Sequence, residues 1–189
     1  MESLLPWFAL KNVPGVGNLL SKRLLDRFQS PDAIFSASSH DLLLVEGMPQ
    51  GLVSAIQHQK ISDQIKREID LVSRKNYKIV TLTDPDYPDL LLQIPDPPPY
   101  LYVYGSLETD TRNISVVGSR NATAYSISTT QRLCTGLASR EITIVSGMAL
   151  GIDTAAHQGA LAGKGKTIAV LGSSLERVYP SENQNLFHQ

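Results

Sequence analysis

The sequence predicts an α/β protein in which a small all-helical domain precedes a Rossmann-like parallel sheet. Residues 114–180 alternate three apolar runs with two helical segments, which is the order of a βαβαβ unit. Each of the first two runs ends in a turn of glycine and small polar residues, a pattern typical of phosphate-binding loops. We therefore expect three parts, namely a helical domain at 1–75, a connector at 76–113 and the sheet domain at 114–189.

The first part has apolar residues spaced as in short helices with one buried face. The expected helical segments are Leu4–Leu10, Leu19–Phe28, Asp41–Val45, Leu52–Gln57 and Ser62–Lys75. Short helices are stable only when they bury these faces against one another. The sequence therefore predicts a small bundle of the helix-hairpin-helix or SAM-like type.

The segment PGVG in this bundle is a candidate nucleic-acid contact. In a helix-hairpin-helix element the glycines present backbone N–H groups to a phosphate, and nearby basic side chains add charge without reading bases. The residues concerned are Gly15, Val16, Gly17 and Lys22, with Arg23 beside them. A second, degraded copy is expected around Gly47 and Gly51. The alternative, that both are ordinary hairpins that pack the bundle, stays open.

The connector contains two strand-like segments separated by prolines, which exclude a helix. We expect its strands to pack on the core and its proline cluster to clamp one domain to the next. We assign its tyrosines to covering a sheet edge rather than to stacking on bases. These tyrosines are Tyr87, Tyr100, Tyr102 and Tyr104.

The first turn of the sheet domain follows an apolar run in the segment ISVVGSRNATAY. Gly118 lets a phosphate approach the backbone, and the N–H groups at the start of the next helix can receive it. The guanidinium of Arg120 can bind two phosphate oxygens at once. With Ser119 between them, these residues are candidate anion ligands, and Arg120 carries most weight.

The second turn repeats this arrangement in IVSGMALGIDTAAH, where Ser146 and Gly147 follow a strand and Gly151 leads into a helix. Turns at the ends of neighbouring parallel strands face one crevice, where open α/β sheets bind ligands. A carboxylate there repels DNA, so Asp153 is expected to cap the helix and brace the turn. His157 is expected to make a structural hydrogen bond, because no triad or metal site accompanies it.

Composition excludes several classes of protein. The single cysteine, Cys134, rules out an internal disulfide framework and a cysteine-rich zinc site. No run approaches the roughly 20 apolar residues of a membrane span, and no signal peptide is evident, so we expect a cytoplasmic protein. The net charge of −1 argues against wholesale coating of nucleic acid, yet residues 114–175 carry five basic and two acidic side chains. This excess favours a polyanion at the turns without establishing one.

The sheet domain also contains an ordered series of motifs, VVGSRNATAYS, SGMALGIDTAAH, KTIAVL and the ending YPSEN. Together they resemble the DNA-processing protein A family, DprA or Smf. Asp-Pro-x-Tyr-Pro and Pro-Pro-x-x-Leu-Tyr elements in the connector and the hairpin of the helical domain are similar to this family as well. The resemblance thus spans essentially the whole chain, and it is far more specific than a lone glycine motif.

The resemblance implies a cytoplasmic protein without catalytic activity or cofactor. Such a protein binds single-stranded DNA in an extended Rossmann domain and loads the RecA recombinase in natural transformation. Carried over by position, the DNA-binding residues are Gly118, Ser119, Arg120, Ser146, Gly147, Met148, Gly151 and Lys166. Lys164 is the alternative to Lys166 as an added charge at the same rim.

The family also forms homodimers, but only the first three strands of its sheet are expected here, so the domain is C-terminally incomplete. The self-association surface of the family lies largely in the half of the sheet that is not present. Whether this chain dimerises or contacts RecA without that half stays open.

Two other classes share this fold. A dinucleotide-dependent oxidoreductase is disfavoured because the first turn is not GxGxxG and no acidic ribose ligand follows the second strand. A nucleotide-phosphate hydrolase of the lysine-decarboxylase-like (LOG) type is the better alternative, although its glycine-rich stretch with a catalytic glutamate is not evident. Release of the base from nucleoside monophosphates would distinguish this enzyme from a DNA-binding protein.

Overall fold

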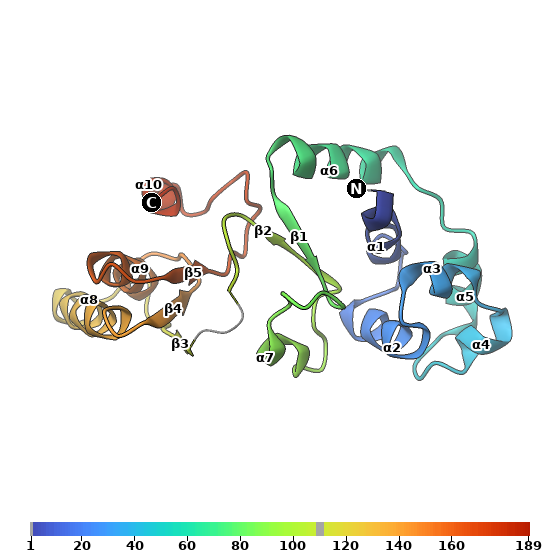
Figure 1. Ribbon diagram of the computed structural model, residues 1–189, viewed down its shortest axis with the longest axis horizontal. Coiled ribbons are helices and arrows are strands. Elements are labelled where there is room, and N and C mark those ends of the chain that lie inside the picture. The colour runs from blue at the N-terminus through green and yellow to red at the C-terminus, as the bar shows by residue number, and fades with distance from the viewer. Residues whose placement is uncertain (1, 109–111) are drawn as a thin grey trace. The chain divides into compact units, whose positions relative to one another are not determined.

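The computed structural model describes residues 2–108 and 112–189, and the chain divides into two compact units, Met1–Thr109 and Asp110–Gln189. The first unit contains short helices and a two-stranded antiparallel sheet, and the second contains a three-stranded parallel sheet with helices (Figure 1). The predicted α/β class with a parallel three-stranded unit is confirmed. Within the described ranges, no helix has the length and apolar character needed to cross a bilayer.

The helical part of the first unit is a series of short elements. They are η1 (Glu2–Leu4), α1 (Leu5–Lys11), α2 (Asn18–Phe28), α3 (Pro31–Ser36), α4 (Ser39–Leu43), α5 (Gln50–Gln57) and α6 (Asp63–Arg74). Ser30, Ser38 and Ser62 each precede a helix and accept a hydrogen bond from a backbone N–H three residues later. These caps satisfy donors that a helix start leaves open, and so fix where α3, α4 and α6 begin.

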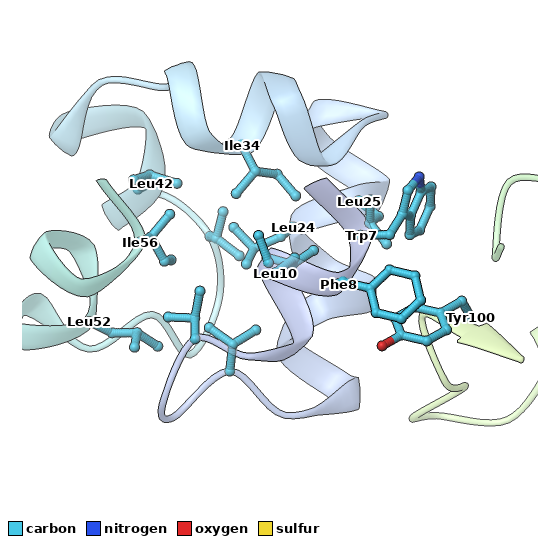
Figure 2. Packing of buried hydrophobic residues seen from close by; sticks show 14 of the residues in the cluster. Trp7, Phe8, Leu10, Leu24, Leu25, Ile34, Leu42, Leu52, Ile56 and Tyr100 are labelled. Carbon is cyan, nitrogen blue, oxygen red and sulfur yellow. The ribbon is translucent and has the colours of Figure 1, made fainter. Parts of the chain in front are cut away.

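Apolar side chains from α1 to α6 meet in one core. Figure 2 shows the part of this core that comes from α1 to α5, with Tyr100 beside it. Phe8 and Leu10 of α1, Leu24 of α2, Ile34 of α3 and Ile56 of α5 are fully buried. Burying a side chain of this size contributes about 1.5–3 kcal/mol. Because the longest of the helices α1 to α6 has twelve residues, these contacts between helices, rather than the propensity of any one helix, hold the bundle together.

Strands β1 (Lys78–Thr81) and β2 (Tyr100–Val103) pair antiparallel, and α7 (Asp89–Leu92) lies in the connection between them. The expectation that prolines exclude a helix in this connection is therefore wrong, because the short helix begins directly after Pro88 and ends before Pro95. This small sheet packs on the helical core, because Tyr100 is buried with its ring centroid 4.8 Å from that of Phe8. The stretch that we treated as a separate connector therefore belongs, as far as it is described up to residue 108, to the helical unit.

Tyrosine side chains fasten this small sheet to the helices. The Tyr102 hydroxyl donates to the Glu68 carboxylate of α6, and the Lys11 ammonium of α1 lies 4.7 Å from the centre of the Tyr100 ring. Tyr87 is buried as well, and burial raises the pKa of its hydroxyl to about 12. These rings are committed to packing and are not free to stack on bases.

The second unit is a βαβαβ arrangement. Its elements are β3 (Arg112–Ser115), α8 (Ala124–Ala138), β4 (Ile142–Ser146), α9 (Ile152–Ala162) and β5 (Thr167–Ala169), followed by η2 (Ser181–Asn183) and α10 (Gln184–Phe187). The strands are parallel in the order β3-β4-β5, with Ile144 of β4 level with Ile114 and Thr167. The carboxyl ends of the strands therefore meet at one edge of the sheet.

Helices α8 and α9 cover the same face of this sheet. Cys134 and Ala138 of α8, Ala156 and Ala160 of α9 and Ile144 of the central strand form one buried cluster. Burial raises the pKa of the Cys134 thiol, which keeps the thiol protonated and suits a packing role. The small side chains let both helices lie close to the strands.

The two helices lie in close contact at Gly159 of α9. A Cβ there would lie 2.5 Å from the carbonyl oxygen of Gln131 and 2.9 Å from the Cβ of Cys134. A Cβ at Gly136, which belongs to α8, would meet only the Arg140 guanidinium, at 3.6 Å. The two glycines thus differ in whether a methyl group fits.

We expect Gly159→Ala to lower the free energy of unfolding by about 1–3 kcal/mol, because the added methyl group forces α8 and α9 apart. Gly136→Ala is the matched control and should raise it by about 0.5–1 kcal/mol, since alanine is the better helix former and nothing obstructs it. Urea unfolding followed by circular dichroism measures both. A rise in the free energy of unfolding for both variants would show that the helix contact is looser than described.

Candidate nucleic-acid interface

The first candidate loop, residues 116–123, leads from β3 into α8. Gly118, Ser119 and Arg120 are exposed, and their backbone N–H groups have no hydrogen-bond partner among the described residues. The Ser119 hydroxyl oxygen accepts a hydrogen bond from the Asn121 N–H at 3.1 Å, which rounds the turn. Open N–H donors ahead of a helix N-terminus form a concavity that attracts anions.

The second candidate loop, residues 147–151, leads from β4 into α9. The Asp153 carboxylate accepts a hydrogen bond from the Ala149 N–H at 3.2 Å. Gly147 makes room for this carboxylate, since a Cβ there would lie 2.9 Å from its oxygen. Asp153 is 7% exposed. Its negative charge therefore faces the loop backbone and not the surface.

The two loops touch through their backbones. A Cβ at Gly151 would lie 2.3 Å from the Ser119 carbonyl oxygen, and Gly151 has a φ of 78°, so glycine is required there. The Ile152 N–H donates to the same oxygen at 3.2 Å, and the Ser146 hydroxyl donates to the Val116 carbonyl at 2.7 Å. The loops thus form one continuous edge along the ends of β3 and β4, which we call the rim (residues 116–123 and 147–151).

This close contact places some of the predicted ligands inside the protein. Ser146 and Met148 are 3% and 4% exposed. The side chain of Ile152 fills the space beside Gly118, where a Cβ would lie 2.7 Å from it. Ser146 and Met148 therefore shape the rim from within and do not reach a ligand, which corrects the expectation that they contact DNA.

Asn183 was missed by sequence reasoning and holds the second loop in place. It is 3% exposed, and its amide nitrogen donates to the Met148 carbonyl at 2.7 Å and to the Thr154 hydroxyl at 2.8 Å. The Thr154 hydroxyl donates in turn to the Ala149 carbonyl at 2.8 Å. The YPSEN motif was the available signal, but only the folded chain shows that its asparagine reaches this loop.

A family profile described as "DNA recombination-mediator protein A" matches residues 78–189, more than half of the chain. The chain belongs to this family. The match begins at β1 and includes the whole rim, so the resemblance inferred from the motifs is confirmed.

Curated family members align over most of the chain. Protein Smf of Synechocystis sp. is 37% identical over 188 residues, which cover 97% of this chain and 47% of that protein. DNA processing protein DprA of Bacillus subtilis is 30% identical over 175 residues, which cover 90% of this chain and 59% of that protein. The chain thus spans about half the length of the curated relatives it matches.

Two solved structures of family members are also similar. The X-ray structure of DprA from Streptococcus pneumoniae matches with a TM-score of 0.79 at 28% identity, covering 96% of this chain and 62% of that one. A structure that concerns the single-stranded DNA binding mode of DNA processing protein A from Helicobacter pylori matches with a TM-score of 0.50 at 34% identity. That match covers 59% of this chain and 51% of the other.

In this member of the DNA recombination-mediator protein A family, His157 is buried in the sheet domain and has a structural role. It is 1% exposed, and its Nδ1 lies 2.7 Å from the Thr167 hydroxyl, which donates to the Ile144 carbonyl. The network assigns the proton to Nδ1 and leaves Nε2 buried without a partner among the described residues. Burial lowers the pKa of His157, against the opposing charge of Asp153. Nowhere in the described ranges do three potential metal ligands gather.

Lys166 does not lie at the rim, contrary to expectation. The Lys166 carbonyl accepts from the Ile144 N–H, which places this residue beside the first half of β4. At about 3.3 Å per residue, the rim begins about 10 Å further along the strands. The reason is that a residue before a parallel strand lies at the opposite edge from the residues that follow it. Lys164 belongs to the same connection, so neither lysine is carried further as a rim residue.

The two hairpins of the helical unit have the same backbone geometry. Gly15 and Gly47 have φ values of 95° and 80°. The next residue in each hairpin donates to a carbonyl three positions earlier, Val16 to Val13 at 3.0 Å and Met48 to Val45 at 3.1 Å. The sequence at Gly47 is therefore a structural repeat of the first hairpin.

Basic side chains near these hairpins are engaged inside the unit. The Lys22 ammonium lies 2.6 Å from the Asp26 carboxylate. The Arg23 guanidinium donates to the Glu46 carbonyl at 2.9 Å and lies 3.2 Å from its carboxylate. Val16 is buried. The first hairpin thus presents its backbone at Gly15 and Gly17 to a ligand, whereas the positive charges of Lys22 and Arg23 are compensated by carboxylates.

Asn183→Ala should lower the free energy of unfolding by about 1–3 kcal/mol, because it leaves a buried carbonyl and the Thr154 hydroxyl without their donor. It should also speed amide hydrogen exchange at residues 147–152. The neighbouring exposed Gln184→Ala is the control and should change neither quantity. Unaltered exchange in Asn183→Ala would show that the asparagine does not hold the loop.

His157 should make stability depend on pH. Because burial disfavours the charged imidazole, the unfolded chain binds a proton more readily than the folded chain below its ordinary pKa of 6.5. The contribution of His157 is therefore constant above that pH, and stability falls below it by at most about 1.4 kcal/mol per pH unit. His157→Gln should remove this fall, whereas the exposed His188→Gln should retain it. Urea unfolding between about pH 7.5 and 5.5 measures the slopes, and equal slopes in both variants would contradict the assignment.

Proposed function

We propose that this chain binds single-stranded DNA along the rim, with little sequence preference. The observation that carries the proposal is the exposed first loop. There the backbone N–H groups of Gly118, Ser119 and Arg120 have no partner among the described residues, and the side chain of Arg120 adds a positive charge. No carboxylate of the described residues pairs with Arg120. Phosphates are the ligand that such donors recognise, and they are the same for every base.

The charge around the rim supports a polyanion. The carboxylate nearest the second loop, Asp153, is buried and bonded to the loop backbone. Helices α8 and α9 follow the two loops, and their N-termini add partial positive charge at the same edge of the sheet. The similar structure of DNA processing protein A from Helicobacter pylori concerns how that protein binds single-stranded DNA, which is the ligand we propose for this chain.

Roles in the proposal differ by residue. Gly118, Ser119 and Arg120 contact a phosphate directly, and Gly147 and Gly151 keep the backbone of the second loop close to it. The hairpin at Gly15 and Gly17 adds a second backbone contact, which is weak because Lys22 is paired with Asp26. We propose further that the chain acts in recombination without being an enzyme, in the cytoplasm, by bringing single strands to a RecA-type recombinase.

Arg120→Ala should weaken the binding of an oligothymidine by about 10-fold to 100-fold, the loss of a charge-assisted hydrogen bond of about 1.5–3 kcal/mol. Arg140→Ala is the matched control, because its guanidinium donates to the Gly136 carbonyl at the other end of α8. Fluorescence anisotropy at several salt concentrations measures both, and affinity should fall as salt rises. Equal affinity of wild type and Arg120→Ala would show that the rim is not the binding site.

A further inference from the structure

The most exposed aromatic ring of the second unit stands at the start of α8. Tyr125 is 79% exposed and is the second residue of the helix, directly after the first loop of the rim. Side chains in a helix tilt toward its N-terminus, so we expect this ring to lie toward the loop that carries Arg120. A ring this exposed contributes little to the core, and its free face is available to a ligand.

The same face of α8 carries a second basic residue. Ser128 and Arg132 follow Tyr125 at three and seven positions, which places them in one row along the helix, and both are exposed. Seven residues are about two turns, so Arg132 stands about 10 Å further along the helix than Tyr125. Helix α8 contains no acidic residue at all. The row therefore has a uniformly positive or neutral surface.

Arg132, which lies within α8, differs from Arg140 just after this helix and from Arg112 of β3. Arg140 donates to the Gly136 carbonyl at 2.6 Å, and Arg112 donates to the Arg140 carbonyl at 3.2 Å. The guanidinium of Arg132, like that of Arg120, has no ion pair or hydrogen bond to any described residue. Its guanidinium keeps all of its donors for an external partner.

Arg132 also lines an open groove between α8 and α9. The groove has a volume of about 460 Å³, and Gln131 and Gln158, which bond to each other at 2.8 Å, lie along it. Its lining contains polar and small residues, and Arg132 is the charged one. The groove therefore places hydrogen-bonding side chains and one positive charge beside α8.

We propose that single-stranded DNA leaves the rim along this face of α8, with one base stacked on Tyr125 and a later phosphate bound by Arg132. This path rests on the proposed function and adds a base contact and a second phosphate contact to it. Stacking on an aromatic ring tolerates any base, because every base has a π face. The guanidinium supplies a charge-assisted contact that fixes the direction of the strand.

The test uses the 189-residue chain and two oligonucleotides of about ten nucleotides, an oligothymidine and an abasic strand of equal length. Tyr125→Ala should weaken binding of the oligothymidine by at least about fivefold and leave binding of the abasic strand unchanged. Tyr125→Phe keeps the ring and should behave as wild type. Arg132→Ala should weaken binding of both strands by about tenfold or more.

Leu133→Ala is the control, since it removes an exposed apolar side chain from the same helix and should change neither affinity. The path along α8 is overturned if Tyr125→Ala affects both strands equally or neither, or if Arg132→Ala binds as wild type. If Arg120→Ala still weakens binding in that case, the rim stands and only the path fails. If wild type binds neither strand, the proposed function fails together with the path.

Discussion

The contact between Gly151 and the Ser119 carbonyl decides the shape of this protein's rim. Two loops that are distant in sequence meet there without any side chain between them, and the Ile152 N–H bonds to the same oxygen. The contact exists because β3 and β4 are adjacent parallel strands, whose carboxyl ends lie at one edge. Asn183, the residue farthest along the chain that takes part, then secures the second loop by its bonds to Met148 and Thr154. Backbone donors are thereby held at fixed positions before any ligand arrives.

The positions of the charged side chains favour an anionic ligand at the rim. A carboxylate beside a phosphate site would repel the ligand. Asp153 does not face the ligand, because its carboxylate is buried and accepts a hydrogen bond from the Ala149 N–H inside the loop. Helix α8, which follows the first loop, has no acidic side chain, and neither the side chain of Arg132 in this helix nor that of Arg120 before it is paired with a described residue. In the helical unit, by contrast, Lys22 and Arg23 are paired. Electrostatic attraction for a polyanion is therefore stronger in the sheet unit.

The sequence was sufficient to predict the strands, most of the helices and the two loops, because apolar runs and glycine turns act locally. The short helices α3 and α7 were not predicted, since each lies beside prolines and has few apolar positions to mark a face. It was insufficient where a residue's role depends on the register of distant segments. Lys166 was assigned to the rim although the register of β5 puts it near the other edge. Ser146 and Met148 were assigned to the ligand although the contact of the loops buries them. Asn183 had no assigned role, since nothing local indicates that a residue after β5 returns to the loop before α9.

Titration of the isotopically labelled protein with an oligothymidine, followed by amide resonances in nuclear magnetic resonance, tests the central claim most directly. Each backbone N–H group reports its own environment, so the measurement separates the rim from the rest of the chain. The account predicts that the amide signals of Gly118, Ser119, Arg120 and Gly147 shift together and saturate at one concentration of DNA. Shifts confined to the hairpin at Gly15 and Gly17, with the rim signals unchanged, would contradict it.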